Sequence, residues 1–266
     1  MRMDYEGYFD LIKAGRNEEA QIMKNQYVPD TLYKYFCLDS RTELNQMKLG
    51  DLKNGKIYLS DLKDFNDPFE GNFFIFDETK LAEKGWDNKQ IEAYLAHIAS
   101  LFKVGCLSSV GENNMPMWAY YANNHQGFCI EYKITEKQKQ FIFPVSYEDE
   151  RIYGNSIVTN MLNGMMKIVH NEFTFENMPE ELRIDIMALV MSMTTKHSSW
   201  SHENEYRILN PFDNYFPLIP NKIFIGMRCD EENVKELINI GNRFDGCEVY
   251  KMQKPGNTTR FELLQN

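Results

Sequence analysis

The chain has 266 residues, of which 43% are hydrophobic and 14% aromatic, and its formal net charge is −10. This composition is typical of a folded globular protein and excludes a chain that is disordered throughout. The acidic balance argues against a general affinity for the phosphate backbone of nucleic acids, although a local basic patch stays open.

Nothing in the sequence predicts a membrane span or a secretory signal. The apolar stretch 186–193 is interrupted by Ser192 and is far shorter than the ~20 residues of a membrane-spanning helix. The chain begins MRMDYE, whereas a signal peptide has a basic start and a leucine-rich run. The five cysteines are widely spaced, as free thiols are in a reducing compartment. We therefore expect a cytoplasmic protein, and without a CxxC or HExxH motif we expect no metal site.

Hydrophobic periodicity predicts alternating helices and strands. Residues 4–27 form two short helices around Ala14-Gly15-Arg16-Asn17, an N-terminal helical extension (1–28) whose Tyr8, Leu11 and Ile22 should pack on the rest of the chain or on a second copy. Strands are predicted at 31–36, 56–60, 104–108, 128–132, 142–147, 205–209, 222–226, 248–252 and 260–264. Helices are predicted at 40–47, 88–102, 116–122, 156–173, 180–196 and 231–240.

The fold class that follows is α+β. We predict a single domain at 29–266 with a mixed, mostly antiparallel or split sheet, which carries the helical N-terminal hairpin and a two-helix insertion at about 154–197. No repeat of fixed period interrupts this pattern.

Several short motifs follow one another in a characteristic order. They are Tyr33-Lys34-Tyr35, Leu59-Ser60, Phe65-Asn66-Asp67-Pro68-Phe69-Glu70, Met117-Trp118-Ala119-Tyr120-Tyr121-Ala122, His125-Gln126-Gly127-Phe128-Cys129-Ile130-Glu131-Tyr132 and Trp200-Ser201-His202-Glu203-Asn204-Glu205-Tyr206-Arg207-Ile208. Together they resemble the bacterial family catalogued as domain of unknown function 2971, from roughly Tyr33 to Gly226. Phe36 departs from the basic residue that often follows the Tyr-Lys-Tyr of that family. The resemblance implies kinship and carries no biochemical activity.

A second likeness, at the level of the layout, suggests a chemistry. A basic strand, an aromatic-Ser strand and a late strand that opens with Glu-x-Glu are similar to the layout of ADP-ribosyltransferases, which split NAD at the nicotinamide bond. The likeness implies that Glu205 is the catalytic carboxylate and that Glu203 is the upstream acid that orients the acceptor. It further implies that Lys34 and Tyr35 bind the NAD ribose or phosphate, and that Ser60 supplies a hydroxyl. Loss of nicotinamide builds positive charge on the ribose, which a nearby carboxylate stabilises.

The segment 200–208 has two interpretations. In the first, Tyr206 and Ile208 alternate into a core while Glu203, Glu205 and Arg207 decorate the half-solvated face of a strand. In the second, these charged groups build a polar pocket. If Glu205 is catalytic, Glu205→Gln is expected to abolish turnover and to leave stability almost unchanged.

Three further places could join a site. Trp118 and His125 share a helix face with Tyr121, so they could stack on a nucleotide or deliver an acid or base, although a core role is favoured for Trp118. Glu131 lies on the strand face opposite its neighbours and could join the site or face water. Asn66 holds an Asx turn or lines a ligand mouth.

We therefore expect a pocket lined by Lys34, Ser60, Asn66, Trp118, His125, Glu131 and Glu205. The expected function is NAD-dependent ADP-ribosyl transfer, by analogy in a toxin or phage-defence setting, with a small-molecule nucleotide and a protein acceptor as partners. Two alternatives stay open. One is a non-catalytic recognition module for a protein partner, and the other is a metal-dependent hydrolase or nuclease that uses Asp67, Glu70, Glu131 and Glu205.

Overall fold

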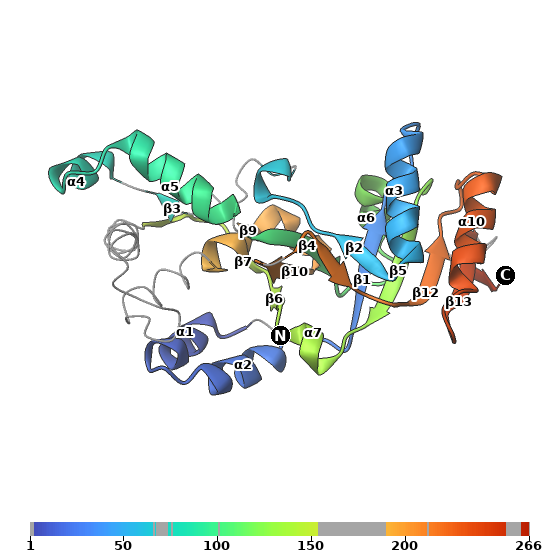
Figure 1. The fold of residues 1–266 in the computed structure, drawn as a ribbon, viewed down its shortest axis with the longest axis horizontal. Coiled ribbons are helices and arrows are strands. Elements are labelled where there is room, and N and C mark those ends of the chain that lie inside the picture. Colours follow the sequence, from blue (N-terminus) through green and yellow to red (C-terminus); the bar gives the residue numbers. More distant parts are fainter. Residues whose placement is uncertain are drawn as a thin grey trace. The chain divides into compact units, whose positions relative to one another are not determined.

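The computed structural model describes residues 3–65, 67, 74–75, 77–100, 102–153, 190–211, 213–253 and 262–265 (Figure 1). Most of the predicted two-helix insertion lies outside these residues. Its predicted end is wrong, because Thr195–His197 forms a strand, β9, where a helix through Lys196 was expected. Residues 190–193 are helical, as predicted.

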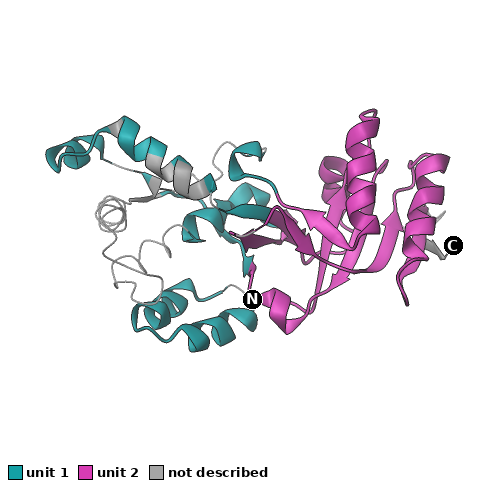
Figure 2. Cartoon of the chain, in the orientation of Figure 1, with its two compact units in different colours: residues 1–28, 60–104, 143–201 teal, residues 29–59, 105–142, 202–266 magenta. Residues whose placement is uncertain are grey.

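Two compact units divide the chain, and each is assembled from three separate segments (Figure 2). Unit 1 comprises Met1–Val28, Ser60–Val104 and Phe143–Ser201, and unit 2 comprises Pro29–Leu59, Gly105–Ile142 and His202–Asn266. The predicted α+β class is confirmed, since both helices and strands form the described chain.

Unit 2 is built on an eight-stranded sheet, in which only the first residues of β4 and the last residues of β6 belong to unit 1. The strands in spatial order are β14 (Glu262–Gln265), β13 (Glu248–Gln253), β12 (Pro220–Ile225), β5 (Phe128–Lys133), β1 (Thr31–Phe36), β4 (Lys103–Ser108), β10 (Glu205–Asn210) and β6 (Ile142–Pro144). β12 pairs with β13 in parallel, whereas β5 pairs with both β1 and β12 in antiparallel fashion. The predicted mixed, mostly antiparallel sheet is confirmed.

Side chains of the sheet alternate between two faces, because successive residues of a strand point to opposite sides. Tyr35 pairs with Cys129, and Cys129 pairs with Phe224, so these three share one face, which we call the aromatic face. On the opposite face, Gly241 lets the backbone of a helix approach the side chains of Val249 and Ile223 closely, where a Cβ atom would collide.

Helices cover both faces of this sheet. α6 (Met115–Tyr121) packs on the aromatic face through Met117 and Trp118. α10 (Glu231–Gly241) lies against β12 and β13 and beside α3 (Thr42–Lys53) (Figure 1). α3 runs past its predicted end at Met47, because Leu49 and Leu52 continue its buried side. The remaining elements of unit 2 are α7 (Glu136–Lys139) and the pair β2 (Lys56–Tyr58) and β11 (Tyr215–Pro217).

Unit 1 contains short helices and two-stranded pairs. Its elements are α1 (Tyr5–Lys13), α2 (Asn17–Asn25), η1 (Leu62–Asp64), β3 (Phe74–Ile75), α4 (Glu78–Glu83), α5 (Asn88–Ser100), β7 (Ser146–Glu148), β8 (Ile152–Tyr153) and β9 (Thr195–His197). β3 pairs with β8, and β7 pairs with β9, both in parallel. The turn η3 (Ser198–Glu203) crosses the boundary between the units.

The predicted N-terminal hairpin is confirmed as α1 and α2, and it docks within unit 1. Tyr8 is buried and meets the ring of Phe143 edge-on, with 6.4 Å between the ring centroids. The ammonium of Lys24, which is also buried, lies 4.7 Å from the centroid of the same ring. Ile22, in contrast, is 62% exposed in this chain, so of its two predicted partners only a second copy stays open as a prediction.

This difference within the hairpin gives a matched pair of variants. Tyr8→Ala is expected to lower the free energy of unfolding by about 2 kcal/mol, because it removes a buried aromatic ring from its contact with Phe143. Ile22→Ala should leave that free energy within about 0.5 kcal/mol of wild type. Urea unfolding followed by circular dichroism measures both, and equal losses in the two variants would contradict the docking of Tyr8.

Candidate functional site

The candidate site lies where three neighbouring strands of unit 2, β1, β4 and β10, run side by side. β1 carries Lys34, β4 ends at Ser108, and β10 begins at Glu205. Tyr33 of β1 is directly opposite Ser108. Strand order therefore brings these strands side by side, although they are far apart in the sequence. Alternation along β1 puts Lys34 on the sheet face opposite Tyr33 and Ser108.

Glu205 forms a buried ion pair with Arg207. Oε1 of Glu205 accepts a hydrogen bond from Nε of Arg207 at 2.9 Å, and Oε2 accepts one from an Nη atom at 3.3 Å. The two side chains are only 3% and 0% exposed. The interpretation of this strand as half-solvated is therefore wrong, because the charged side chains at 205 and 207 are buried as well as Ile208.

Lys34 and Cys106 lie beside this ion pair. Nζ of Lys34 donates a hydrogen bond to the backbone oxygen of Cys106 at 3.1 Å. Burial lowers the pKa of Lys34, against the opposing influence of Cys106 and Glu205. Burial also raises the pKa of the Cys106 thiol well above its usual value, and the charge of Glu205 adds to this effect. Cys106 is thus a protonated, unreactive thiol at neutral pH.

Glu203 ends η3 and is held differently from Glu205. Its buried carboxylate accepts a hydrogen bond from the hydroxyl of Tyr121, and the hydroxyl of Ser108 donates to its backbone oxygen at 2.6 Å. Asn204, between the two glutamates, has a φ of +45°, and its backbone oxygen accepts from the amide of Ser109 at 3.0 Å. This turn separates the environments of the two carboxylates, so that Glu205 meets a guanidinium and Glu203 meets a neutral phenol.

The hydroxyl of Tyr121 can be tested alone. Tyr121→Phe keeps the ring and removes the donor to Glu203, so we expect the free energy of unfolding to fall by about 1–2 kcal/mol, since a buried carboxylate loses a hydrogen bond. Tyr120→Phe is the matched control, because Tyr120 is the neighbouring residue on α6 and is 68% exposed. Urea unfolding that gives the same midpoint for both variants would show that this hydrogen bond contributes nothing.

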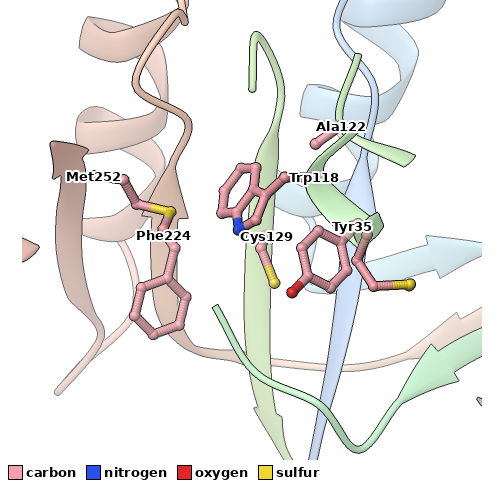
Figure 3. Packing of buried hydrophobic residues seen from close by; sticks show 7 residues of the cluster. Tyr35, Trp118, Ala122, Cys129, Phe224 and Met252 are labelled. Atoms are coloured by element: carbon pink, nitrogen blue, oxygen red, sulfur yellow. The ribbon is translucent and has the colours of Figure 1, made fainter. Parts of the chain in front are cut away.

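Trp118 and Tyr35 belong to the core of unit 2, which confirms the core interpretation of Trp118. Trp118 has no exposed surface, and its indole meets the ring of Tyr35 edge-on at 5.4 Å between centroids. Figure 3 shows the indole beside Cys129, with Tyr35 on one side and Phe224 and Met252 on the other. In this structure neither ring presents a face on which a nucleotide could stack.

His125 stacks on Trp118, with 5.5 Å between ring centroids and 10° between the ring planes. Burial lowers the pKa of His125, and the charge of Arg228 adds to this effect. The imidazole is therefore mostly neutral at neutral pH.

The backbone that carries His125 is unusual, and sequence analysis missed it. Asn123, Asn124 and His125 have φ values of +47°, +52° and +70°, in the left-handed region that non-glycine residues rarely adopt. The side chain of Asn123 secures the turn by donating to the backbone oxygen of Leu38 at 2.8 Å. The signal was two consecutive asparagines after a helix, since asparagine tolerates this conformation best. Such strain is typical of functional segments.

The structure describes only part of the predicted loop and its neighbour on the preceding strand, namely Ser60 and Asp67 but not Asn66 or Glu70. Ser60 forms an antiparallel bridge with Val104 at the start of β4, in unit 1. Asp67 is buried, and Asn66 and Glu70 lie outside the described residues. The predicted convergence of Ser60 and Asn66 with the carboxylates stays a prediction.

Glu131 lies on the aromatic face, as the alternation along β5 predicts. Oε2 of Glu131 accepts from the hydroxyl of Tyr33 at 2.9 Å, and Oε1 accepts from Nδ2 of Asn221 at 2.5 Å. Glu131 is buried and does not face water.

The comparison with known proteins identifies one relationship. Residues 117–208 match the family described as Protein of unknown function (DUF2971). The predicted kinship is confirmed over this stretch, which contains most of α6, all of β5 and the Glu-x-Glu segment. Neither the curated proteins nor the solved structures yield a match.

Three further findings concern the described part of the chain. None of its helices has the length and apolar character needed to cross a bilayer. All five cysteines are free thiols. Within the same residues, His, Cys, Asp and Glu side chains nowhere gather in a group of three that could hold a metal ion.

Proposed function

We propose that this chain is an ADP-ribosyltransferase-like enzyme that uses NAD as its substrate in the bacterial cytoplasm. The observation that carries the proposal is the adjacency of β1, β4 and β10. This order brings Lys34 of the first strand within the electrostatic influence of Glu205 of the last, which supports those two parts of the layout. The predicted strand of Ser60 is not between them, since β2 pairs with β11 in a separate sheet.

In the proposed reaction, the bond between the nicotinamide nitrogen and C1 of the ribose breaks, and nicotinamide leaves with the electron pair. The ribose becomes positively charged, and a nucleophile of the acceptor then bonds to C1 and loses its proton. A carboxylate that stays charged near C1 lowers the energy of the cationic state. The chain must therefore supply a carboxylate close to C1 of the ribose.

We assign Glu203 the electrostatic role that the likeness gave to Glu205, because the charge of Glu205 is balanced by Arg207. The carboxylate of Glu203 accepts a hydrogen bond from the hydroxyl of Tyr121. We assign Glu205 and Arg207 the role of holding the start of β10. We assign Ser108, in place of Ser60, the role of the hydroxyl on the middle strand, where it positions Glu203 through the backbone oxygen.

The test is nicotinamide release from NAD by the purified full chain, with and without bacterial cell lysate as a source of acceptors. We expect release above a heat-denatured control, and we expect lysate to increase it. NAD should also raise the melting temperature, because a ligand that binds the folded state stabilises it. If the protein neither binds NAD nor releases nicotinamide, the proposed function is wrong.

A recognition module for a protein partner is the second candidate, and one observation favours it. Tyr120 and Met115, both on α6, are 68% and 40% exposed. Exposed aromatic and methionine side chains are typical of protein contacts. A Tyr120→Ser variant that keeps nicotinamide release but loses modification of a lysate protein would assign this surface to the acceptor. Loss of a bound partner without any NAD chemistry would instead favour the module.

A further inference from the structure

A row of polar side chains crosses five neighbouring strands on the aromatic face. Strand pairing aligns Glu248, Lys222, Glu131, Tyr33 and Ser108, one each from β13, β12, β5, β1 and β4. We call these five residues the polar row. The next positions along the same strands, Tyr250, Phe224, Cys129 and Tyr35, form an adjacent row that is almost entirely apolar. The sheet therefore packs well without charge at such positions, and stability alone does not require the polar row.

Contacts within the polar row leave hydrogen-bonding capacity. Nζ of Lys222 lies 3.9 Å from Oε1 of Glu131 and 3.8 Å from Oε2 of Glu248. Both distances exceed the roughly 2.7–3.2 Å of a direct hydrogen bond. As far as the described residues go, the ammonium is therefore oriented by two carboxylates while it keeps N–H donors for an incoming oxygen atom.

The row is accessible at the end formed by β12 and β13. The side chains of Lys222 and Glu248 are 35% and 44% exposed, whereas that of Glu131 is 11% exposed. The rings of Tyr33 and Tyr250 are partly buried against the aromatic cluster, and the hydroxyl of Tyr250 donates to Glu248 at 2.6 Å. Two tyrosine rings therefore lie beside the carboxylates, which accept hydrogen bonds, and the ammonium, which donates them.

We propose that the polar row binds the vicinal hydroxyls of a sugar ring. Carboxylates accept hydrogen bonds from hydroxyl groups, an ammonium donates to hydroxyl or ring oxygens, and tyrosine rings pack against the C–H face of a sugar. A phosphate fits poorly, because two carboxylates lie within 4 Å of the ammonium. A cationic ligand would be repelled by the ammonium of Lys222. A neutral ring with several hydroxyls can donate hydrogen bonds to the carboxylates and accept them from the ammonium.

Two sources supply this chemistry, namely the ribose of a nucleotide and a free sugar. The ribose of a nucleotide is expected only if the proposed function is right. It is favoured because Ser108, at the far end of the polar row, also donates a hydrogen bond to the backbone of Glu203. The proposal that the polar row binds hydroxyl groups does not depend on the proposed function.

The experiment measures binding of AMP, 2′,3′-dideoxy-AMP and D-ribose to the full chain by titration in NMR. We expect AMP to bind at least roughly tenfold more tightly than the dideoxy compound, because the latter lacks the vicinal hydroxyls. Lys222→Met and Glu248→Gln should each weaken AMP roughly tenfold and leave the dideoxy compound unchanged. Lys235→Met, an exposed lysine on α10, is the matched control and should change neither. Circular dichroism confirms that the variants fold.

Each outcome separates the polar row from the proposed function. Equal affinity for AMP and the dideoxy compound would show that the polar row does not bind vicinal hydroxyls. The same conclusion would follow if the variants lowered the affinity for both compounds alike. Binding of D-ribose that depends on Lys222, without any binding of AMP or NAD, would support the row and count against NAD as the substrate. Nicotinamide release that is unaffected by Lys222→Met, with no binding of D-ribose or AMP, would support the enzyme and overturn the row.

Discussion

Glu205→Gln is expected to lower the free energy of unfolding by about 3–4 kcal/mol, because it removes the negative charge from a buried ion pair with Arg207. The sequence alone predicted almost no change, since it could not show that the pair is buried. Glutamine keeps one oxygen that can accept from Arg207, which limits the loss. Urea unfolding at pH 7, followed by circular dichroism, measures the difference.

Two comparisons isolate the ion pair from other effects of the substitution. Glu232→Gln, an exposed carboxylate on α10, should change the free energy of unfolding by no more than about 0.5 kcal/mol. The double variant Glu205→Leu with Arg207→Met should recover most of the stability that either single change loses, because no unpaired charge stays buried. An unfolding midpoint of Glu205→Gln equal to that of wild type would show that the pair does not stabilise the fold.

Glu203→Gln is expected to lower the rate of nicotinamide release by about 10²–10³-fold, if the carboxylate stabilises the ribosyl cation as proposed. Glutamine has the same shape and still accepts a hydrogen bond from Tyr121, so NAD binding and folding should persist. The expected signature is therefore a fall in kcat with little change in KM. Nicotinamide release, measured with purified wild type and variant, gives both values.

Glu205→Gln serves as the comparison for catalysis, assayed at a temperature at which it is fully folded. There we expect it to release nicotinamide within about tenfold of the wild-type rate, because Glu205 supports β10 without touching the substrate. The reverse pattern, with Glu203→Gln active and folded Glu205→Gln inactive, would return the catalytic role to Glu205. In that case Glu203 would be the acid that orients the acceptor.

The sequence by itself determined most of the secondary structure and the kinship. Alternation with a period of two located β1, β5, β10, β12 and β13, because each strand buries at least one face and so imposes the pattern on its residues. Helix boundaries were less certain, as the extension of α3 shows. The motifs were sufficient to predict the kinship that the family match confirms over residues 117–208, because each motif is a short continuous stretch of the chain.

Only the tertiary structure decided the partners of the candidate site residues. Pairing of β4 with β1 and β10 brings Ser108 beside Tyr33 and beneath Glu203. Neighbours of this kind depend on the order of strands in the sheet, which the period of a single strand does not encode. The same reason explains why burial of Glu205 escaped the sequence: a strand pattern shows which residues share a face, and only the surrounding elements determine whether that face meets water.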